Sequence, residues 1–348
     1  MSKVEYQKLG ASGLSISPII IGCMTFGKHL NWCIDEEESV MEILKKCYDN
    51  GLRTFDTADV YSNGASEILL GKFIKKYNIP RERIVILTKV WGTMDYNDPE
   101  FNMHQLGNNK YPEINYVNSK GLSRKHILNA VEHSVKNLGT YIDVYQIHRL
   151  DRSTPKDEIM KALHDVVEGG KVRYLGASSM KAVEFAQLQF VAEKNGWTKF
   201  ISMQNYYNLL YREEEREMIP FCKENGFGKV SIIPWSPIAM GLLARPLSSD
   251  GTERLTKDQI FARMGLTNPT EADKEIIYRV QKIAEKYEVS MAAVATKWVL
   301  SKGANPIVGV NSMERVDDFV KALNFELTES EIALLEAPYV AKETLAMW

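Results

Sequence analysis

Residues 53–67 read RTFDTADVYSNGASE and hold the pattern that decides the fold. The run Arg53–Asp56 has the length of a short buried strand, and it ends in a carboxylate. A polar turn that contains Tyr61 follows, and Ser66–Tyr77 then has the start signal and the apolar period of a helix. We therefore expect one strand followed by one helix in this part of the chain.

The same alternation extends in both directions along the chain. A hairpin is expected first, from Tyr6–Leu9 and Leu14–Ser17 around a glycine-bounded turn. Eight runs have the pattern of strands: Ile19–Gly22, Arg53–Asp56, Ile84–Lys89, Asp143–His148, Tyr174–Ala177, Phe200–Gln204, Ser231–Pro234 and Pro306–Gly309. Eight stretches have the pattern of helices: Glu36–Asn50, Ser66–Tyr77, Ser123–Leu138, Asp157–Gly169, Lys181–Asn195, Glu213–Asn225, Ser290–Ser301 and Ser312–Ala322. Because no G-x-G-x-x-G sequence follows the first strand, the alternation favours an α/β fold of the (β/α)8 or TIM barrel type over a doubly wound sheet.

Three stretches fall outside this alternation: 92–122, 236–272 and 325–348. The first is polar and rich in Asn and Tyr, and it has the period of neither a helix nor a strand. The first two both follow strands, so in a barrel they are expected at the C-terminal face, where such barrels place their active sites. The third should hold one short helix. Length alone allows one barrel or two domains, and the pattern predicts a single barrel domain over residues 1–348.

The composition narrows the classes of function. The chain has 348 residues, 45% of them hydrophobic and 25% charged, and its formal net charge is -2, so nothing indicates binding to nucleic acid or to an anionic membrane. The four cysteines form no C-x-x-C pair, and the initial MSKVEYQ lacks the apolar stretch of a signal peptide. The apolar runs are shorter than the roughly 18 residues of a membrane span. We expect a reducing, cytoplasmic compartment and small-molecule partners.

Ionisable residues end three of the expected strands, where a barrel would bring them together. Asp56 and Tyr61 follow the second strand, Lys89 ends the third and His148 ends the fourth. Tyrosine has a pKa of about 10, so it needs a neighbouring ammonium such as Lys89 to act in acid-base catalysis near neutrality. Asp56 can hold that lysine, and His148 can orient a substrate oxygen. The set suits protonation of a carbonyl oxygen by Tyr61 as hydride reaches the carbonyl carbon.

The stretch FDTADVYSNGASEILLG, residues 55–71, resembles the signature of the aldo-keto reductases, and the likeness covers nearly the whole chain. The phrase LGASSM, residues 175–180, and the long insertion after the third strand are similar to aryl-alcohol dehydrogenase-like members of fungal type. The resemblance implies a TIM barrel with an N-terminal hairpin and reduction of aldehydes or ketones with NADPH, without a Rossmann fold. It implies a catalytic tetrad of Asp56, Tyr61, Lys89 and His148.

The resemblance also implies which residues contact the cofactor. Ser178, Ser179 and Gln204 correspond to groups that bind the nicotinamide carboxamide, and Trp235 corresponds to an aromatic residue that stacks on the nicotinamide ring. The loop 236–272 would cover the cofactor, beginning with Ser236, Leu242 and Arg245 at the pyrophosphate. The adenosine-phosphate end would be bound by Gly309, Asn311, Ser312 and Arg315, with Arg315 favouring NADPH over NADH.

Two other functions fit parts of this pattern. A regulatory subunit that binds cofactor, similar to the potassium-channel β-subunits of this superfamily, could keep the same tetrad. A metal-dependent barrel hydrolase is disfavoured because no H-x-H or carboxylate cluster ends a strand. For the substrate, an aromatic or bulky apolar carbonyl compound is expected, from Tyr96, Phe101, Tyr111 and Tyr116 in the insertion and from Met24 and Trp91 at strand ends. The sequence carries no signal for the oligomeric state.

Overall fold

The structure is a computed structural model that describes residues 4–28, 33–247, 261–262 and 264–345. A short antiparallel hairpin, β1 (Gln7–Lys8) and β2 (Ser15–Ile16), comes first, as the sequence predicted. Eight parallel strands then form one sheet in the order β10-β3-β4-β5-β6-β7-β8-β9. Their bounds are β3 Ile20–Gly22, β4 Thr54–Asp56, β5 Val85–Val90, β6 Ile142–Ile147, β7 Val172–Ser178, β8 Phe200–Gln204, β9 Ser231–Ile232 and β10 Ile307–Gly309.

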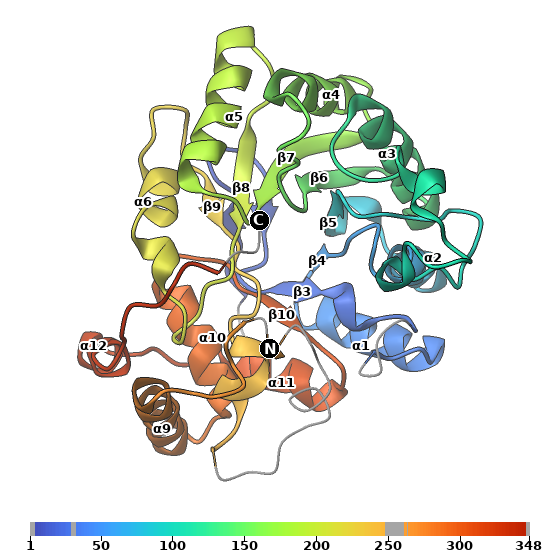
Figure 1. Cartoon of the computed structure of the whole chain (residues 1–348). Helices are drawn as coiled ribbons and strands as arrows, with labels where there is room; N and C mark the ends of the chain where they lie inside the picture. The colour runs from blue at the N-terminus through green and yellow to red at the C-terminus, as the bar shows by residue number, and fades with distance from the viewer. Residues whose placement is uncertain (1–3, 29–32, 248–260, 263, 346–348) are drawn as a thin grey trace.

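The two edges of this sheet meet and close it. The Ile307 amide donates to the Pro234 carbonyl oxygen at 2.8 Å, and the Asn305 amide donates to that of Ile232 at 2.9 Å. A parallel bridge joins Trp235 to Ile307 just beyond β9. Helices surround the strands in Figure 1. The prediction of a (β/α)8 barrel is confirmed.

The helices that follow the strands cover the outside of the barrel with their apolar faces. They are α1 Glu37–Asp49, α2 Ala65–Lys76, α3 Arg124–Leu138, α4 Lys156–Glu168, α5 Ala182–Asn195, α6 Met218–Lys223, α9 Glu271–Tyr287, α10 Met291–Ser301, α11 Met313–Lys321 and α12 Glu329–Glu336. Short 3-10 turns lie at η1 Cys23–Thr25, η2 Arg81–Arg83, η3 Met103–Gln105, η4 Glu113–Tyr116, η5 Glu213–Glu215 and η6 Ala239–Ala244. The short helix expected within 325–348 is α12.

Two helical segments differ from the sequence prediction. The helix expected over Glu213–Asn225 is a 3-10 turn, η5, followed by the short α6. Pro220 has no amide hydrogen and is tolerated only in the first turn of a helix, so α6 begins close before it. The other difference is α9, a helix that the sequence prediction lacked. Thr270 and Asp273 form a capping box at its start.

The inside of the barrel changes from apolar to polar along the strands. Alternate residues of a strand point to the same face, so Val85, Leu87 and Lys89 of β5 share the inward direction. The hairpin contributes to an apolar cluster that fills the first part of the interior, formed by Leu9, Ile16, Ile20, Val85, Leu87, Val144, Ile233 and Ile307. Lys89 therefore lies one inward position beyond this apolar plug, towards the carboxyl ends of the strands.

The insertion 92–122 has an internal core of its own. Phe101, Tyr111 and Tyr116 are buried against one another, with ring centroids 5.0 Å and 5.1 Å apart, and Leu106 packs beside them. Tyr96 stacks on His133 of α3. The expectation that these four aromatic residues line a substrate pocket needs correction, because their rings are used in packing within the insertion and onto α3.

Candidate active site

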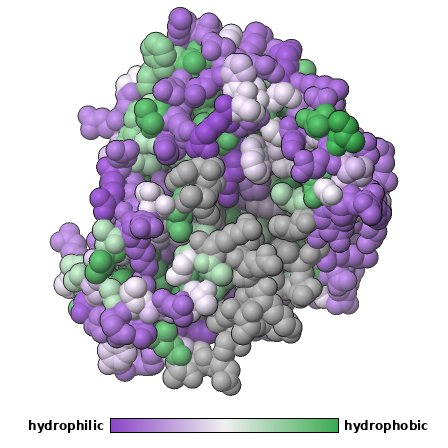
Figure 2. All heavy atoms as spheres, in the orientation of Figure 1, coloured by the Kyte–Doolittle hydropathy of each residue, from purple (hydrophilic) through white to green (hydrophobic). Residues whose placement is uncertain are grey.

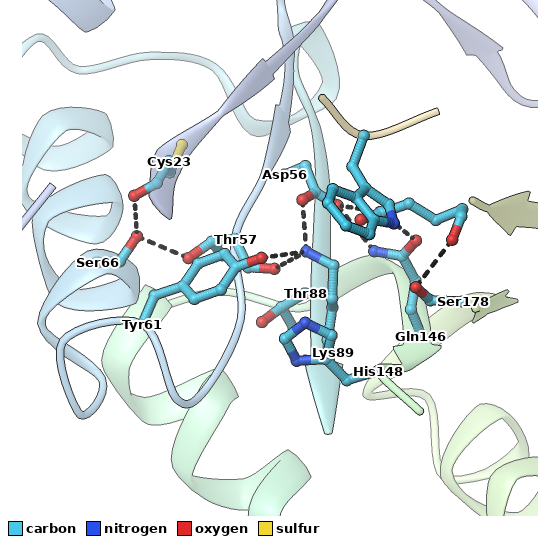
Figure 3. Close-up of polar contacts among 12 residues, drawn as sticks. Cys23, Asp56, Thr57, Tyr61, Ser66, Thr88, Lys89, Gln146, His148 and Ser178 are labelled. Carbon is cyan, nitrogen blue, oxygen red and sulfur yellow. Dashed lines mark hydrogen bonds and ion pairs between the residues drawn. The ribbon is translucent and has the colours of Figure 1, made fainter. Parts of the chain in front are cut away.

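A buried ion pair joins β4 to β5 at the carboxyl ends of the strands (Figure 3). Lys89 is fully buried, and its Nζ lies 2.5 Å from Asp56 Oδ1. The same nitrogen donates to the Thr57 carbonyl oxygen at 2.9 Å and lies 3.2 Å from Tyr61 Oη. Three of the four residues expected to act together are therefore in direct contact.

The surroundings of Lys89 keep it charged. Burial lowers the pKa of the Lys89 ammonium, but the Asp56 carboxylate and Tyr61 raise it by more, so the net pKa is above its ordinary value. Asp56 can play this part because its second carboxylate oxygen is also bonded, by two side-chain amides. A buried ammonium with a carboxylate partner and further acceptors is a stable arrangement.

Tyr61 stays protonated in this structure. Burial raises the pKa of its hydroxyl, and the charge of Lys89 and the hydrogen bond to it lower the pKa by less. The lowering by Lys89 was expected from the sequence, and the larger effect of burial was not. A protonated phenol beside an ammonium can donate a proton, and the phenolate left behind would be stabilised by Lys89.

His148 follows β6 and faces Tyr61. The two ring centroids are 5.8 Å apart and the rings are nearly perpendicular. Burial lowers the pKa of the His148 imidazole well below its ordinary value, and the charges of Arg149 and Lys89 lower it further. The imidazole is therefore neutral at physiological pH, with one ring nitrogen able to donate a hydrogen bond and the other able to accept one.

Gln146 is a part of this site that sequence reasoning missed. It is fully buried on β6, and its Nε2 donates to Asp56 Oδ2 at 2.9 Å. The Nε2 of Gln204 donates both to Asp56 Oδ2 and to Gln146 Oε1, at 3.0 Å each. Gln146 thus connects the carboxylate that holds Lys89 to a residue expected to bind cofactor. A polar residue two positions before His148, on the same face of an apolar strand, was the signal that could have revealed it.

Gly176 makes room for this network. It lies on β7 between Gln146 of β6 and Ser202 of β8 in the strand register. A Cβ at Gly176 would lie 2.9 Å from Gln146 Cγ and 2.6 Å from Ser202 Oγ, both closer than ordinary contacts. The phrase LGASSM therefore needs a glycine at this position, because any larger side chain would clash with Gln146 and Ser202.

The groups expected to hold a nicotinamide lie next to this network. Ser178 Oγ donates to the Gln204 carbonyl oxygen at 2.9 Å, and Trp235 Nε1 donates to Ser179 Oγ at 3.3 Å. The Trp235 ring is supported by Tyr206, with centroids 4.8 Å apart. Ser179 adopts a left-handed backbone with φ of 45°, which is uncommon outside glycine and often occurs at functional turns.

The remaining residues expected at the cofactor lie further along the chain. Ser236 has a left-handed backbone with φ of 52°, and Leu242 packs against the cluster that contains Tyr206. Gly309 ends β10, Asn311 is exposed, and the Ser312 side chain caps α11 by accepting from the Arg315 amide at 3.4 Å. The parts of the loop 236–272 at residues 248–260 and 263 lie outside the described residues.

A cavity of about 290 Å³ lies between residues 244–245 and the helices α10 and α11. It is lined by Ala244, Arg245, Ser290, Ala292, Arg315, Asp318 and Phe319. The two guanidinium groups lie near enough that the charge of Arg315, after burial, lowers the pKa of Arg245. Arg245 Nε is enclosed without a partner, and within the described chain neither arginine forms an ion pair. Such a cavity suits an anion.

Comparison with known proteins identifies the family. The sequence model of the Aldo/keto reductase family matches residues 18–339. The chain belongs to the aldo/keto reductase family. Two relatives are similar over nearly their full length: a Saccharomyces cerevisiae protein named as an aryl-alcohol dehydrogenase, 53% identical over 97% of this chain and 98% of its own, and the versiconal hemiacetal acetate reductase of Aspergillus parasiticus, 52% identical over the same shares. Aldo-keto reductase AMT2 of Alternaria alternata is 45% identical over 98% of this chain and 93% of its own. This aldo/keto reductase is therefore an oxidoreductase.

A second feature of this aldo/keto reductase that sequence reasoning missed is Arg149, directly after His148. Its Nη1 donates to the His148 carbonyl oxygen at 2.6 Å and lies 3.4 Å from Ser178 Oγ. Nothing in the sequence distinguishes this arginine from a solvated one, because its importance depends on burial and on the lack of a carboxylate partner. Tyr206, which supports Trp235, was also missed.

Three further observations concern this aldo/keto reductase as a whole. The part of the face coloured in Figure 2 is mainly hydrophilic, with hydrophobic residues in small separate groups. Across the residues that the structure describes, no helix is long and apolar enough to span a bilayer. In the same residues no group of three or more His, Cys, Asp or Glu side chains is arranged to hold a metal ion.

Proposed function

We propose that this aldo/keto reductase reduces an aldehyde or ketone to an alcohol with NADPH, and that Tyr61 gives the proton. The observation that carries the proposal is the contact of Tyr61 Oη with Lys89 Nζ, which Asp56 holds in turn. As a hydride reaches the carbonyl carbon, the carbonyl oxygen takes the Tyr61 proton, and Lys89 stabilises the phenolate until solvent returns a proton. The neutral His148 orients the carbonyl oxygen by a hydrogen bond.

The residues present fit a nicotinamide cofactor, which supplies the hydride when bound. The hydroxyls of Ser178 and Ser179 and the amide of Gln204 are the kind of groups that a carboxamide needs, and Trp235 offers a flat ring. At the other end, the unpartnered donor of Arg245 fits a phosphate oxygen. We propose that Ser236, Leu242 and Arg245 hold the pyrophosphate side of the loop, and that Gly309, Asn311, Ser312 and Arg315 hold the adenosine-phosphate end.

The preference for NADPH over NADH rests on the two arginines of the cavity. The 2′-phosphate that distinguishes NADPH would meet Arg315, and a charge-assisted hydrogen bond is worth about 10- to 150-fold in affinity. Asp317, a nearby carboxylate, is already paired with Lys46 of α1 at 2.6 Å. The start of α11 at Ser312 adds the favourable field of a helix N-terminus.

The cofactor proposal is tested by titrating NADPH and NADH while tryptophan fluorescence is followed, in wild type, Arg315→Ala and Arg173→Ala. Arg173 is an exposed arginine at the start of β7 and serves as the matched control. We expect Arg315→Ala to weaken NADPH about 10- to 150-fold, with NADH and the control variant nearly unchanged. Equal wild-type affinities for the two cofactors would overturn the preference, and unchanged NADPH affinity in Arg315→Ala would overturn the role of Arg315.

The reaction itself is tested by following NADPH oxidation with a panel of carbonyl compounds. We propose aromatic or bulky apolar substrates, which the names of the relatives from Saccharomyces cerevisiae and Aspergillus parasiticus support. Cofactor binding without turnover of any member would instead favour the regulatory-subunit alternative. We also propose that residues 1–348 act as one barrel domain in the cytoplasm, which is consistent with four free cysteines, three of them buried.

A further inference from the structure

Arg149 lies next to the proposed active site, and its guanidinium forms no ion pair with any carboxylate that the structure describes. A guanidinium carries five N–H donors. Nη1 is used on the His148 carbonyl oxygen and, weakly, on Ser178 Oγ. The other nitrogens have no acceptor anywhere in the described chain, and neither of them is among the fully enclosed unpartnered atoms. Donors therefore remain that a ligand can reach.

Two carboxylates of this region, Asp56 and Asp151, are bonded by groups other than Arg149. Asp56 is bonded by Lys89 and by two amides. Asp151, two residues further along the chain, accepts from Ser153, from Thr154 and from a backbone amide. These bonds outweigh its burial and hold the pKa of Asp151 at about 2.

Other arginines of the chain form ion pairs with carboxylates. Arg81 pairs with Asp143 at 2.6 Å, and the exposed Arg152 pairs with Glu184 at 2.6 Å. Arg149 is partly buried, and this burial lowers the pKa of its guanidinium, while none of the described carboxylates forms an ion pair with it. A buried charge is costly unless an opposite charge accompanies it. A missing partner is therefore a reason to look for an anionic ligand.

The position of Arg149 indicates that the anionic ligand is the substrate. The guanidinium bonds the backbone of His148 and approaches Ser178, two residues labelled in Figure 3. Its charge also lowers the pKa values of His148 and Tyr61, so it acts on the groups that would meet the carbonyl oxygen. An anion bound here would lie beside the reacting carbonyl. Neither Arg149 nor its two contacts, His148 and Ser178, line the cavity of Arg245 and Arg315.

We propose that Arg149 binds an anionic oxygen of the substrate, so that, among the aromatic or bulky carbonyl compounds proposed above, those with a carboxylate or an ionised hydroxyl close to the carbonyl group are preferred. This inference rests on the proposed function of the same site. A planar guanidinium can bind a carboxylate through two parallel hydrogen bonds, which fixes the direction of the substrate as well as its charge. Arg149 is then a residue that determines specificity within the proposed reaction.

The test compares matched pairs of substrates that differ in charge. 2-Carboxybenzaldehyde and its methyl ester form one pair, and 2-hydroxybenzaldehyde and its methyl ether form the other. The ratio of kcat/KM within each pair is measured for wild type, Arg149→Met and the control Arg152→Met. For the carboxylate pair we expect the ratio to fall about 10- to 150-fold in Arg149→Met and to stay unchanged in Arg152→Met. The second pair is measured at a pH at which the hydroxyl is ionised; a similar fall in Arg149→Met supports binding of the ionised hydroxyl, and an unchanged ratio overturns that part of the proposal.

The outcomes separate this inference from the proposed function. A wild-type enzyme that reduces the neutral and the anionic member equally well, or an Arg149→Met variant that loses the same factor on both, would overturn the anion site and leave reduction intact. If the wild-type enzyme oxidises NADPH in the presence of none of the carbonyl compounds tested, the proposed function is overturned. In that case benzoate binding, measured by calorimetry in wild type and Arg149→Met, still decides the anion site: weaker binding in the variant supports it, and equal binding overturns it.

Discussion

Removing the amide of Gln146 tests whether the network behind Asp56 contributes to function or only to packing. In Gln146→Leu the side chain keeps a similar volume and loses both hydrogen-bonding atoms. Asp56 Oδ2 loses one of its two amide donors, and Gln204 loses one of its two acceptors. The contact of Lys89 with Asp56 Oδ1 is not altered directly.

The expected magnitude follows from these bonds. A hydrogen bond to a charged group contributes about 1.5–3 kcal/mol, and one between neutral groups contributes about 0.5–1.5 kcal/mol. Asp56 keeps Lys89 and Gln204, so we expect a loss near the lower end, about 1.5–2 kcal/mol. If that loss is felt in the transition state, kcat falls about 10- to 30-fold. A loosened Gln204 should also weaken NADPH binding by a few-fold.

The assay needs kcat, the dissociation constant of NADPH and the free energy of unfolding for wild type, Gln146→Leu and Gln189→Leu. Gln189 is the matched control, because it is also fully buried and makes two hydrogen bonds, both to the backbone of Phe200 on the outer side of the barrel. Both variants should lose stability, and only Gln146→Leu should lose turnover and cofactor affinity. Equal kinetic parameters in the two variants would refute the argument and leave Gln146 a structural residue.

Three further changes have defined outcomes. Tyr61→Phe should lower kcat by about 10²- to 10⁴-fold while NADPH binding stays near wild type, and a variant within a few-fold of wild type would contradict its role as proton donor. Lys89→Met removes the charge that lowers the pKa of Tyr61, so the alkaline limb of the pH–rate profile should move to higher pH as kcat falls; an unmoved limb counts against the contact. Replacing residues 99–118 with a short Gly-Ser connection removes the aromatic cluster of the insertion 92–122, and because this insertion is expected at the C-terminal face beside the substrate, KM and substrate preference should change more than Tm. Unchanged substrate parameters would show that the insertion does not contribute to substrate binding.

The barrel could be predicted because the hydrophobic period of each segment and the alternation of strands and helices along the chain are both visible in the sequence. Each strand was found within a few residues of its bounds, and the polar residues Asp56, Lys89 and His148 at the strand ends followed from the rule that parallel strands end at one face. The helix α9 was missed although Thr270 and Asp273 have the spacing of a capping box. Eight strands each followed by one helix already account for a complete barrel, so the alternation does not predict an additional helix here.

Other features depend on contacts between side chains that are distant in the sequence, and the hydrophobic period of a segment does not indicate such contacts. The aromatic residues of the insertion could contact either a ligand or one another. Because the composition is the same in both cases, the sequence does not distinguish them. The pKa of Tyr61 depends on the balance between burial and the charge of Lys89, and the sequence gives the sign of each effect without their relative size. Gln146 differs, because a polar residue at an inward position of an apolar strand is visible in the sequence itself.

The charges of the site explain how one arrangement can serve both proton transfer and recognition of an anion. Lys89 is balanced by Asp56 and His148 is neutral, so the charge of Arg149 is the one left without compensation among these groups. That charge helps to lower the pKa of Tyr61 against the larger effect of burial. A substrate anion bound to Arg149 would offset its field, and the Tyr61 pKa would then rise. Tyr61 would hold its proton more firmly while an anionic substrate binds and would release it once negative charge develops on the carbonyl oxygen, beside Lys89.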